Sequence, residues 1–148
     1  MTKEVLLSLR GLQFDAASAD GDKIETITPA EYYKRNDSHY IIFDEAMEGF
    51  AESTKNIMKF KNNSLDLTKK GLVNVHMTFE ENKKNMTNYS TPYGDILIGI
   101  DARSIRLQEE EERIVVDVDY ALEINYEHFA DCKIKVDVRP QGKEGFVL

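Results

Sequence analysis

Apolar and polar side chains alternate with a period of two along the second half of the chain. Between residues 114 and 126 the even-numbered positions are all apolar or aromatic: Ile114, Val116, Val118, Tyr120, Leu122, Ile124 and Tyr126. Most positions between them are polar, among them Asp117, Asp119 and Glu123. Because successive side chains of a β-strand point to opposite faces, this pattern predicts a strand with one buried face and one solvated face. A helix would spread the acidic side chains around its whole circumference.

The preceding stretch, residues 95–107, alternates in the same way with one interruption. Its apolar positions are even-numbered up to Ala102 and odd-numbered from Ile105 onward. One extra residue in a β-bulge produces such a change of parity, so we expect a bulge between Ala102 and Ile105. A two-residue turn at Glu110-Glu111 then joins the two strands into a hairpin, with Ile105 opposite Val116 and Ala102 opposite Val118. The four acids 109–112 at its tip indicate a solvated turn, or alternatively an acidic docking site.

A further strand follows, with alternating apolar positions at Ala130, Cys132, Ile134, Val136 and Val138. Both strands of this hairpin direct even-numbered residues inward, so their loop must contain an odd number of residues. We expect the three-residue loop Asn125-Tyr126-Glu127, which places Asp117 opposite Lys135 and Asp119 opposite Lys133. Shifting this register by two residues would set two aspartates opposite each other, which is unfavourable.

The rest of the chain contains similar short alternating segments separated by turn residues. We expect strands at 3–14, 23–28, 31–35, 39–45, 54–61, 64–70, 73–79 and 85–89, with the second ending at Pro29. Asn62-Asn63 predicts a two-residue turn that sets Phe60 opposite Leu65 and Met58 opposite Leu67. Another turn is predicted at Thr91, Pro92, Tyr93 and Gly94, where Gly94 supplies the positive φ of a type II turn.

These segments predict an all-β fold with almost no helix. A meander of this length is expected to close on itself, which leaves no open sheet edge. We therefore predict a single antiparallel β-barrel of about 8–10 strands over residues 1–140, followed by a C-terminal tail at 141–148.

Composition and charge narrow the choice of partners. The 148-residue chain carries a net charge of −8, which argues against nucleic acid and anionic membranes. It contains no apolar run long enough for a transmembrane helix, and the acidic start at Glu4 is unlike a signal peptide. A single cysteine, Cys132, excludes an internal disulfide, and a reducing cytoplasm is the simplest location.

Four segments resemble a known family. They are Gly11 at the end of the first strand, the sequence Glu31-Tyr32-Tyr33-Lys34, the sequence from Val75 to Glu81, and above all Tyr89-Ser90-Thr91-Pro92-Tyr93-Gly94. Together they are similar to the YwiB-like family of small bacterial proteins of unknown function. The resemblance covers about residues 3–139 and implies a calycin-like (lipocalin-related) β-barrel, with no known catalytic residue. This chain departs from the family pattern at Asn125-Tyr126, where a turn containing glycine is more usual.

Catalytic and metal chemistry have no clear signature in the sequence. His39, His76 and His128 are far apart, and none has another metal-binding residue at a characteristic spacing. Cys132 lies on the apolar face of its strand, opposite Tyr120, as a buried structural thiol would. The sequence therefore predicts a non-enzymatic protein with no metal and no cofactor.

Three classes of function remain, of which an enzyme ranks last because the sequence shows no convergent acid, base or nucleophile. The first is the binding of a small apolar ligand inside the barrel, where the predicted lining is Tyr33, Phe43, Met58, Phe60, Met77, Phe79, Tyr120 and Tyr126. The alternative is a protein–protein interaction or structural module whose barrel is filled by these side chains. In that case the hairpin from Tyr32 to Phe43, apolar on both faces, would contact a protein partner or a second copy of the chain.

Overall fold

The protein is a sheet of ten antiparallel strands in this computed structural model, which describes residues 1–11, 25–46 and 49–142. The strands are β1 (Glu4–Arg10), β2 (Glu25–Arg35), β3 (Ser38–Ala46), β4 (Ser53–Lys61), β5 (Ser64–Gly71), β6 (Val75–Glu80), β7 (Lys83–Thr91), β8 (Gly94–Glu110), β9 (Arg113–Ile124) and β10 (Glu127–Pro140). The described residues contain no helix, and therefore none that could span a membrane.

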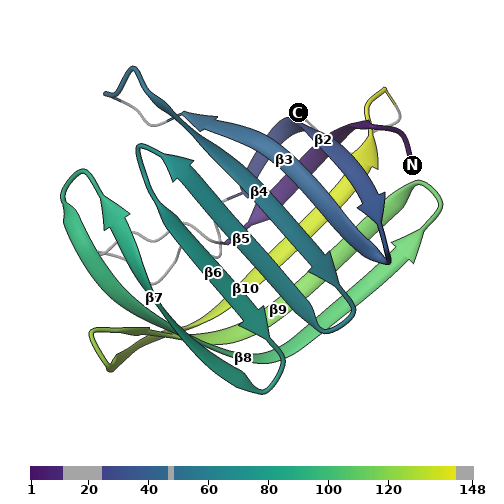
Figure 1. The fold of residues 1–148 in the computed structure, drawn as a ribbon. Helices are drawn as coiled ribbons and strands as arrows, with labels where there is room; N and C mark the ends of the chain where they lie inside the picture. The colour runs from purple at the N-terminus through teal and green to yellow at the C-terminus, as the bar shows by residue number, and fades with distance from the viewer. Residues whose placement is uncertain (12–24, 47–48, 143–148) are drawn as a thin grey trace.

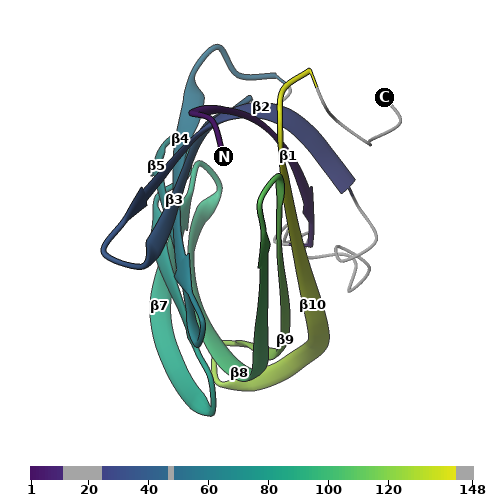
Figure 2. The same cartoon turned by 90° about the vertical axis from the view of Figure 1, so that its right-hand side faces the viewer.

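The sheet curls into a nearly closed barrel. Its strand order is β6-β5-β4-β3-β2-β1-β10-β9-β8-β7, so the first and last strands of the chain are paired in the middle of the sheet. Figures 1 and 2 show β2–β6 forming one wall and β8–β10 the opposite wall. The two ends of the sheet meet at β6 and β7, where Asn74 and Ser90 form an isolated bridge. The predicted all-β antiparallel barrel is confirmed.

The predicted bulge in β8 is also present. The register of β8 on β9 shifts between Ala102 and Ser104. The backbone N–H of Ile105, just beyond the bulge, donates a hydrogen bond of 3.0 Å to the Glu81 carboxylate in the β6–β7 turn. This contact links the irregular point of β8 to the seam of the barrel.

The turn between β8 and β9 lies one residue later than predicted. Glu110 pairs with Arg113, so the turn residues are Glu111 and Glu112, and Ile105 lies opposite Val118 instead of Val116. The actual pairing differs from the predicted one by two residues. A shift of two leaves every side chain on the same face, so the apolar pattern could not distinguish the two registers. The actual register also places Glu110 opposite a positive charge.

The hairpin of β9 and β10 has the predicted register but a different turn. Lys135 lies opposite Asp117 and Lys133 opposite Asp119, as expected. The turn has only two residues, Asn125 and Tyr126, both with positive φ (51° and 70°). The register shifts between His128 and Ala130, so one extra residue lies in β10. This extra residue keeps the even-numbered residues of both strands inward, as the third loop residue of the predicted turn would have done. Tyr126 consequently lies at the tip with 75% of its surface exposed, and its predicted inward position was wrong.

Strand β2 continues through Pro29, where the sequence predicted its end. Pro29 lies opposite Leu6 of β1, whereas the pairing of β2 with β3 begins only at Glu31. Proline is tolerated here because this half of β2 has a single neighbour, so one edge of its backbone needs no hydrogen-bond donor.

Tyr33 faces outward, contrary to its predicted place in the lining. Tyr32 occupies the inward position on β2 and is buried, so the adjacent Tyr33 must lie on the outer face. There its hydroxyl donates to Glu31, and the Lys3 ammonium lies 5.5 Å from its ring centroid. The outer face of this hairpin is thus partly covered by a lysine side chain.

The predicted turn at Thr91, Pro92, Tyr93 and Gly94 is present, with one difference in geometry. Gly94 has a φ of 126°, as expected for a glycine position, but it pairs with Thr91 and therefore follows the two central residues. Tyr93, the second central residue, does not have the positive φ that a type II turn requires. The Thr91 hydroxyl closes the turn, accepting from the N–H of Tyr93 and donating to the Gly94 carbonyl.

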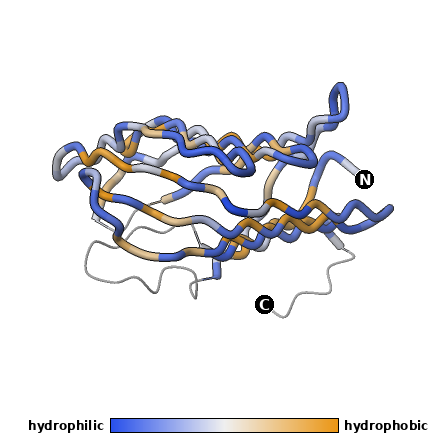
Figure 3. The backbone as a smooth tube through the Cα atoms, turned by 90° about the horizontal axis from the view of Figure 1, so that it is seen from below, coloured by the Kyte–Doolittle hydropathy of each residue, from blue (hydrophilic) through white to orange (hydrophobic). Residues whose placement is uncertain are grey.

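The core lies between the two walls. Hydropathy alternates along the strands, as Figure 3 shows by colour. At its centre, Phe79 of β6 packs edge-on against Tyr120 of β9 on the facing wall, with ring centroids 5.0 Å apart. Apolar side chains from both walls are fully buried around this pair, including Met58, Phe60, Leu65, Leu67, Met77, Ile100 and Leu122. This level of the barrel is a packed apolar core.

Candidate functional site

Strands β3–β6 direct their inward side chains into rows that cross the sheet. The first row is His39, Phe60, Leu65 and Phe79, and the second is Ile41, Met58, Leu67 and Met77. The third row is Phe43, Asn56, Lys69 and Val75, and Glu45 and Thr54 pair in the row beyond it. The inner surface thus changes from apolar to polar between the second row and the third.

The third row contains an amide and an ammonium in buried positions. Asn56 has no exposed surface and Lys69 is only 6% exposed. The Lys69 ammonium donates to Glu45 Oε1 over 2.8 Å, and Asn56 Nδ2 contacts the same oxygen at 3.4 Å. Glu45, Asn56 and Lys69 therefore form one connected cluster, which we call the polar triad.

One atom of the polar triad is left without a partner. The side-chain oxygen of Asn56, Oδ1, is buried and has no hydrogen-bond donor among the residues that the structure describes. Rotating the amide by 180° does not solve this, because Oδ1 would then face the Glu45 carboxylate and the Thr54 carbonyl, which now contact Nδ2. A buried acceptor without a donor costs roughly 1–3 kcal/mol.

Burial and the negative charge of Glu45 both contribute to a raised pKa of Tyr89, on β7 at the other edge of the sheet. Burial is the larger cause, and together they raise the pKa of Tyr89 to about 12. Tyr89 therefore keeps its phenolic proton at neutral pH.

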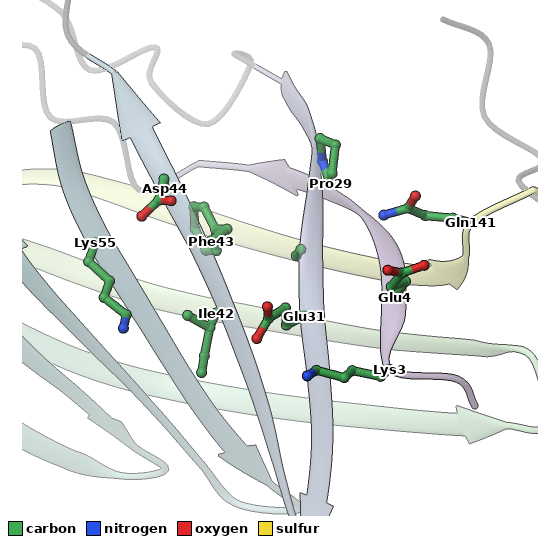
Figure 4. A pocket seen from close by; sticks show the side chains of 10 residues that line it. Lys3, Glu4, Pro29, Glu31, Ile42, Phe43, Asp44, Lys55 and Gln141 are labelled. Carbon is green, nitrogen blue, oxygen red and sulfur yellow. The ribbon is translucent and has the colours of Figure 1, made fainter.

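Within the part of the chain that the structure describes, the polar triad lies beside a gap in the pairing of two strands. Strands β2 and β3 are paired from Arg35↔Ser38, next to their turn, to Glu31↔Ile42 and then separate, as Figure 4 shows. Beyond that point, among the described residues, β2 pairs only with β1, and β3 only with β4. We call the space between the separated strands the β2–β3 fork.

Two pockets occupy the β2–β3 fork. The inner pocket has a volume of about 280 Å³ and includes Lys69, Glu45, Phe43, Thr26 and Thr28 in its lining. The outer pocket, drawn in Figure 4, has a volume of about 500 Å³ and is lined by Pro29, Ala30, Ile42, Asp44 and Lys55 among others. Phe43 and Asp44 border both pockets. The two pockets are therefore neighbours, and the inner one is bordered by Lys69 and Glu45 of the polar triad.

A second polar group lies at the opposite end of the barrel. His39 is buried, stacks on Phe60 with a centroid distance of 5.0 Å, and contacts the Tyr32 hydroxyl through Nδ1 at 2.7 Å. Its Nε2 lies 3.3 Å from Glu109, which also binds the Lys34 ammonium at 2.9 Å. Since an ionised carboxylate only accepts, neutral His39 carries its proton on Nε2 and accepts the Tyr32 hydroxyl proton at Nδ1.

Burial, hydrogen bonding and the neighbouring charges shift the pKa values of His39, Glu109 and Tyr32. Burial lowers the pKa of His39, although the Glu109 carboxylate partly opposes that effect. The hydrogen bond from Lys34 lowers the pKa of Glu109. Burial and the charge of Glu109 raise the pKa of Tyr32 to about 12. Both ring nitrogens of His39 have partners within the protein, so we interpret the group as structural.

We expect His39 to make the fold less stable as the pH falls. Its pKa is lower in the folded protein than in the unfolded chain, so the unfolded chain takes up a proton first as the pH drops below about 6.5. The free energy of unfolding should therefore decrease between about pH 7.5 and about pH 5.5, and His39→Gln should lose less stability over this range. Urea unfolding at the two pH values measures this. His76→Gln, at an exposed histidine, should keep the wild-type dependence, and equal slopes for His39→Gln and wild type would contradict the prediction.

The structure places the predicted lining residues in two groups. Six are inward and buried: Phe43, Met58, Phe60, Met77, Phe79 and Tyr120. Tyr33 and Tyr126 are exposed and lie outside the barrel. All six belong to the apolar core, and Phe43 also borders the fork pockets. Contact of any of them with a ligand stays a prediction.

The sequence interpretation missed the polar triad. Asn56 and Lys69 extend the predicted pairing of Phe60 with Leu65 and of Met58 with Leu67 by one further inward pair. Their inward parity was thus available in the sequence, and two polar residues at core positions are the signal that identifies them. Within the described residues, no three His, Cys, Asp or Glu side chains are grouped as metal ligands would be.

Comparison with known proteins places the chain among domains without an assigned activity. The sequence model of the domain of unknown function DUF1934 matches residues 7–136. The crystal structure of the ywiB protein from Bacillus subtilis superimposes with a TM-score of 0.76 at 16% identity, covering 93% of this chain and 92% of that one. No curated protein matches the sequence. The predicted resemblance to the YwiB-like family is confirmed, and the structural likeness shows the same fold.

Proposed function

Because this chain belongs to the DUF1934 family of domains of unknown function, we propose a function from its own site: the binding of a small molecule at the polar triad, with entry through the β2–β3 fork. The observation that carries this proposal is the buried Asn56 Oδ1 without a donor, next to the buried Lys69–Glu45 pair. A ligand with a polar head and an apolar body fits this surface best.

The energetics of the third row support a role in binding. Burying an ammonium and an amide costs free energy even when they are partly paired, and apolar side chains of similar size would be at least as stable. The first two rows contain such apolar side chains at most of the corresponding positions. The polar triad thus lowers stability at a place that borders the inner pocket, as binding sites commonly do.

The apolar body of the ligand has a surface to pack against. Phe43 and Leu9 line the inner pocket, and the second row with Met58 and Met77 lies one step deeper. Methionine side chains adapt to irregular shapes, so this row can adjust to a bound molecule. The apolar lining predicted from the sequence would then form the floor of the site.

A neutral fluorophore tests the proposal. Prodan has a naphthalene body and a carbonyl that can accept a hydrogen bond from Lys69. We expect saturable binding with a blue-shifted emission to the wild type, and binding weakened at least about tenfold in Lys69→Met.

The matched control is Lys70→Met, which removes the same charge from the next, exposed position of β5. It should bind prodan like the wild type. Absence of saturable binding to the wild type, or equal binding to all three proteins, would refute the proposed site.

A further inference from the structure

The polar triad presents a donor and an acceptor side by side. Asn56 and Lys69 lie directly opposite each other on β4 and β5, and directly paired residues have Cβ atoms only about 4.5–5.5 Å apart. Asn56 offers Oδ1 as a buried acceptor. Lys69 has three ammonium protons, one of which is used by Glu45.

A single ligand group can satisfy both neighbours if it carries an acceptor next to a donor. Amides and lactams have this arrangement, with a C=O beside an N–H on one edge. We propose that the head group of the ligand is a neutral amide or lactam, whose N–H donates to Asn56 Oδ1 and whose carbonyl accepts from Lys69. This inference rests on the proposed function, since it names the chemistry of the molecule bound at that site.

The charges around the pocket favour a neutral head group over a charged one. The positive charge of Lys69 is already balanced by Glu45, and Asp44 adds a further negative charge to the pocket lining. A carboxylate would be repelled by both acids. An ammonium would meet the ammonium of Lys69, which is nearly buried and therefore poorly screened.

The amino group of Asn56, Nδ2, is engaged by two acceptors, whereas the side-chain oxygen, Oδ1, has no donor among the described residues. Nδ2 contacts the Glu45 carboxylate and the Thr54 carbonyl, which are both hydrogen-bond acceptors. These two contacts set the orientation of the amide, because the flipped amide would place Oδ1 against them. A ligand carbonyl at Oδ1 would leave two acceptors in contact without a proton between them. The position therefore selects for a donor, and discrimination against analogues that lack the donor is a known property of such sites.

Asn56 is fully buried and does not itself line the inner pocket, so binding at Oδ1 requires a neighbouring side chain to move. Phe43 and Lys69 flank Asn56 in the third row, and both line the inner pocket. Binding at Oδ1 requires that rotation of one of these side chains opens the pocket to the amide, a change that needs no rearrangement of the strands. The flat body of an aromatic lactam would then pack against the Phe43 ring.

Matched bicyclic probes test the inference. Quinolin-2(1H)-one carries the N–H and C=O edge, 1-methylquinolin-2(1H)-one lacks the donor, and 2-naphthoate and 2-naphthylmethylammonium are charged. Affinities for the wild type can be measured by isothermal titration or by displacement of prodan. We expect quinolin-2(1H)-one to bind about tenfold more tightly than its N-methyl derivative, and both charged probes to bind more weakly than the lactam.

The variant Asn56→Leu tests whether Asn56 Oδ1 causes the preference for quinolin-2(1H)-one over its N-methyl derivative. It should bind the two quinolinones within about threefold of each other, whereas Asn88→Leu, at an exposed asparagine of β7, should keep the preference. If Asn56→Leu does not fold, the ratio in the wild type decides the matter.

Equal affinities for the two quinolinones, a preference that survives in Asn56→Leu, or tighter binding of either charged probe would each overturn the inference. The proposed function fails separately, through the absence of prodan binding or its indifference to Lys69→Met. If prodan binds through Lys69 but N-methylation has no effect, the site stands and the amide or lactam head group is excluded.

Discussion

Replacing Gly71 by alanine is expected to destabilise the fold by about 2 kcal/mol or more. Gly71 ends β5 opposite Thr54 with a φ of 142°, a conformation that is strained for a side chain with a Cβ. A Cβ added there would also lie 2.4 Å from the backbone carbonyl oxygen of Ser53. Because the neighbouring atom belongs to the backbone, the strand itself must move to make room. Urea denaturation of both proteins measures the loss.

Gly94→Ala is the matched control for this substitution. Gly94 also has a positive φ, 126°, but a Cβ there would have no atom within 4 Å. It should therefore show the backbone strain alone, on the order of 1 kcal/mol. The difference between the two variants measures the close approach of β5 to β4. Equal losses would mean that the Ser53 carbonyl moves at little cost.

The second large effect is expected from Met77→Trp. Met77 has no exposed surface, is paired with Leu67 on the adjacent strand, and is two residues from Phe79, whose ring packs against Tyr120. Inserting a larger side chain into such a core typically costs about 1–3 kcal/mol. Thermal or urea unfolding should show a loss in this range, together with a retained β-sheet circular dichroism spectrum.

Met77→Leu, which nearly conserves the volume, should cost less than about 1.5 kcal/mol. A Met77→Trp protein as stable as the wild type would show that the barrel has free space at this level. In that case the binding site would extend from the polar triad into the second row, as the apolar lining predicted from the sequence implies.

The barrel and its inner face could be predicted from the sequence because parity is a local property. Alternation identified the bulge near Arg103, and cross-strand charge pairing added the choice of Lys135 as the partner of Asp117. Alternation could not fix the turn at Glu111-Glu112, since a register shifted by two residues presents the same faces to the core. Nor did it show that Asn125-Tyr126 adopts positive φ at both positions, because tyrosine is seldom found there.

Only part of the candidate site could be predicted from the sequence. Asn56 and Lys69 follow from the predicted hairpin of β4 and β5, whose register the structure reproduces. The β2–β3 fork does not follow, because it depends on where two strands stop pairing and follow different neighbours. Pro29 is the one local sign of it, and a proline at that position is equally compatible with the end of a strand.

The order of the strands has a consequence for how the chain folds. Of the nine neighbouring pairs in the order of the sheet, eight join strands that are consecutive in the chain, and the ninth joins β1 to β10. Leu7 meets Val138 in that ninth ladder, so almost the whole chain must be brought round to close it. Local hairpins form early because their loops cost little entropy, whereas such a distant contact is slow to form. Two meanders, β1–β6 and β7–β10, would therefore form first, and their docking along β1 and β10 would limit the folding rate.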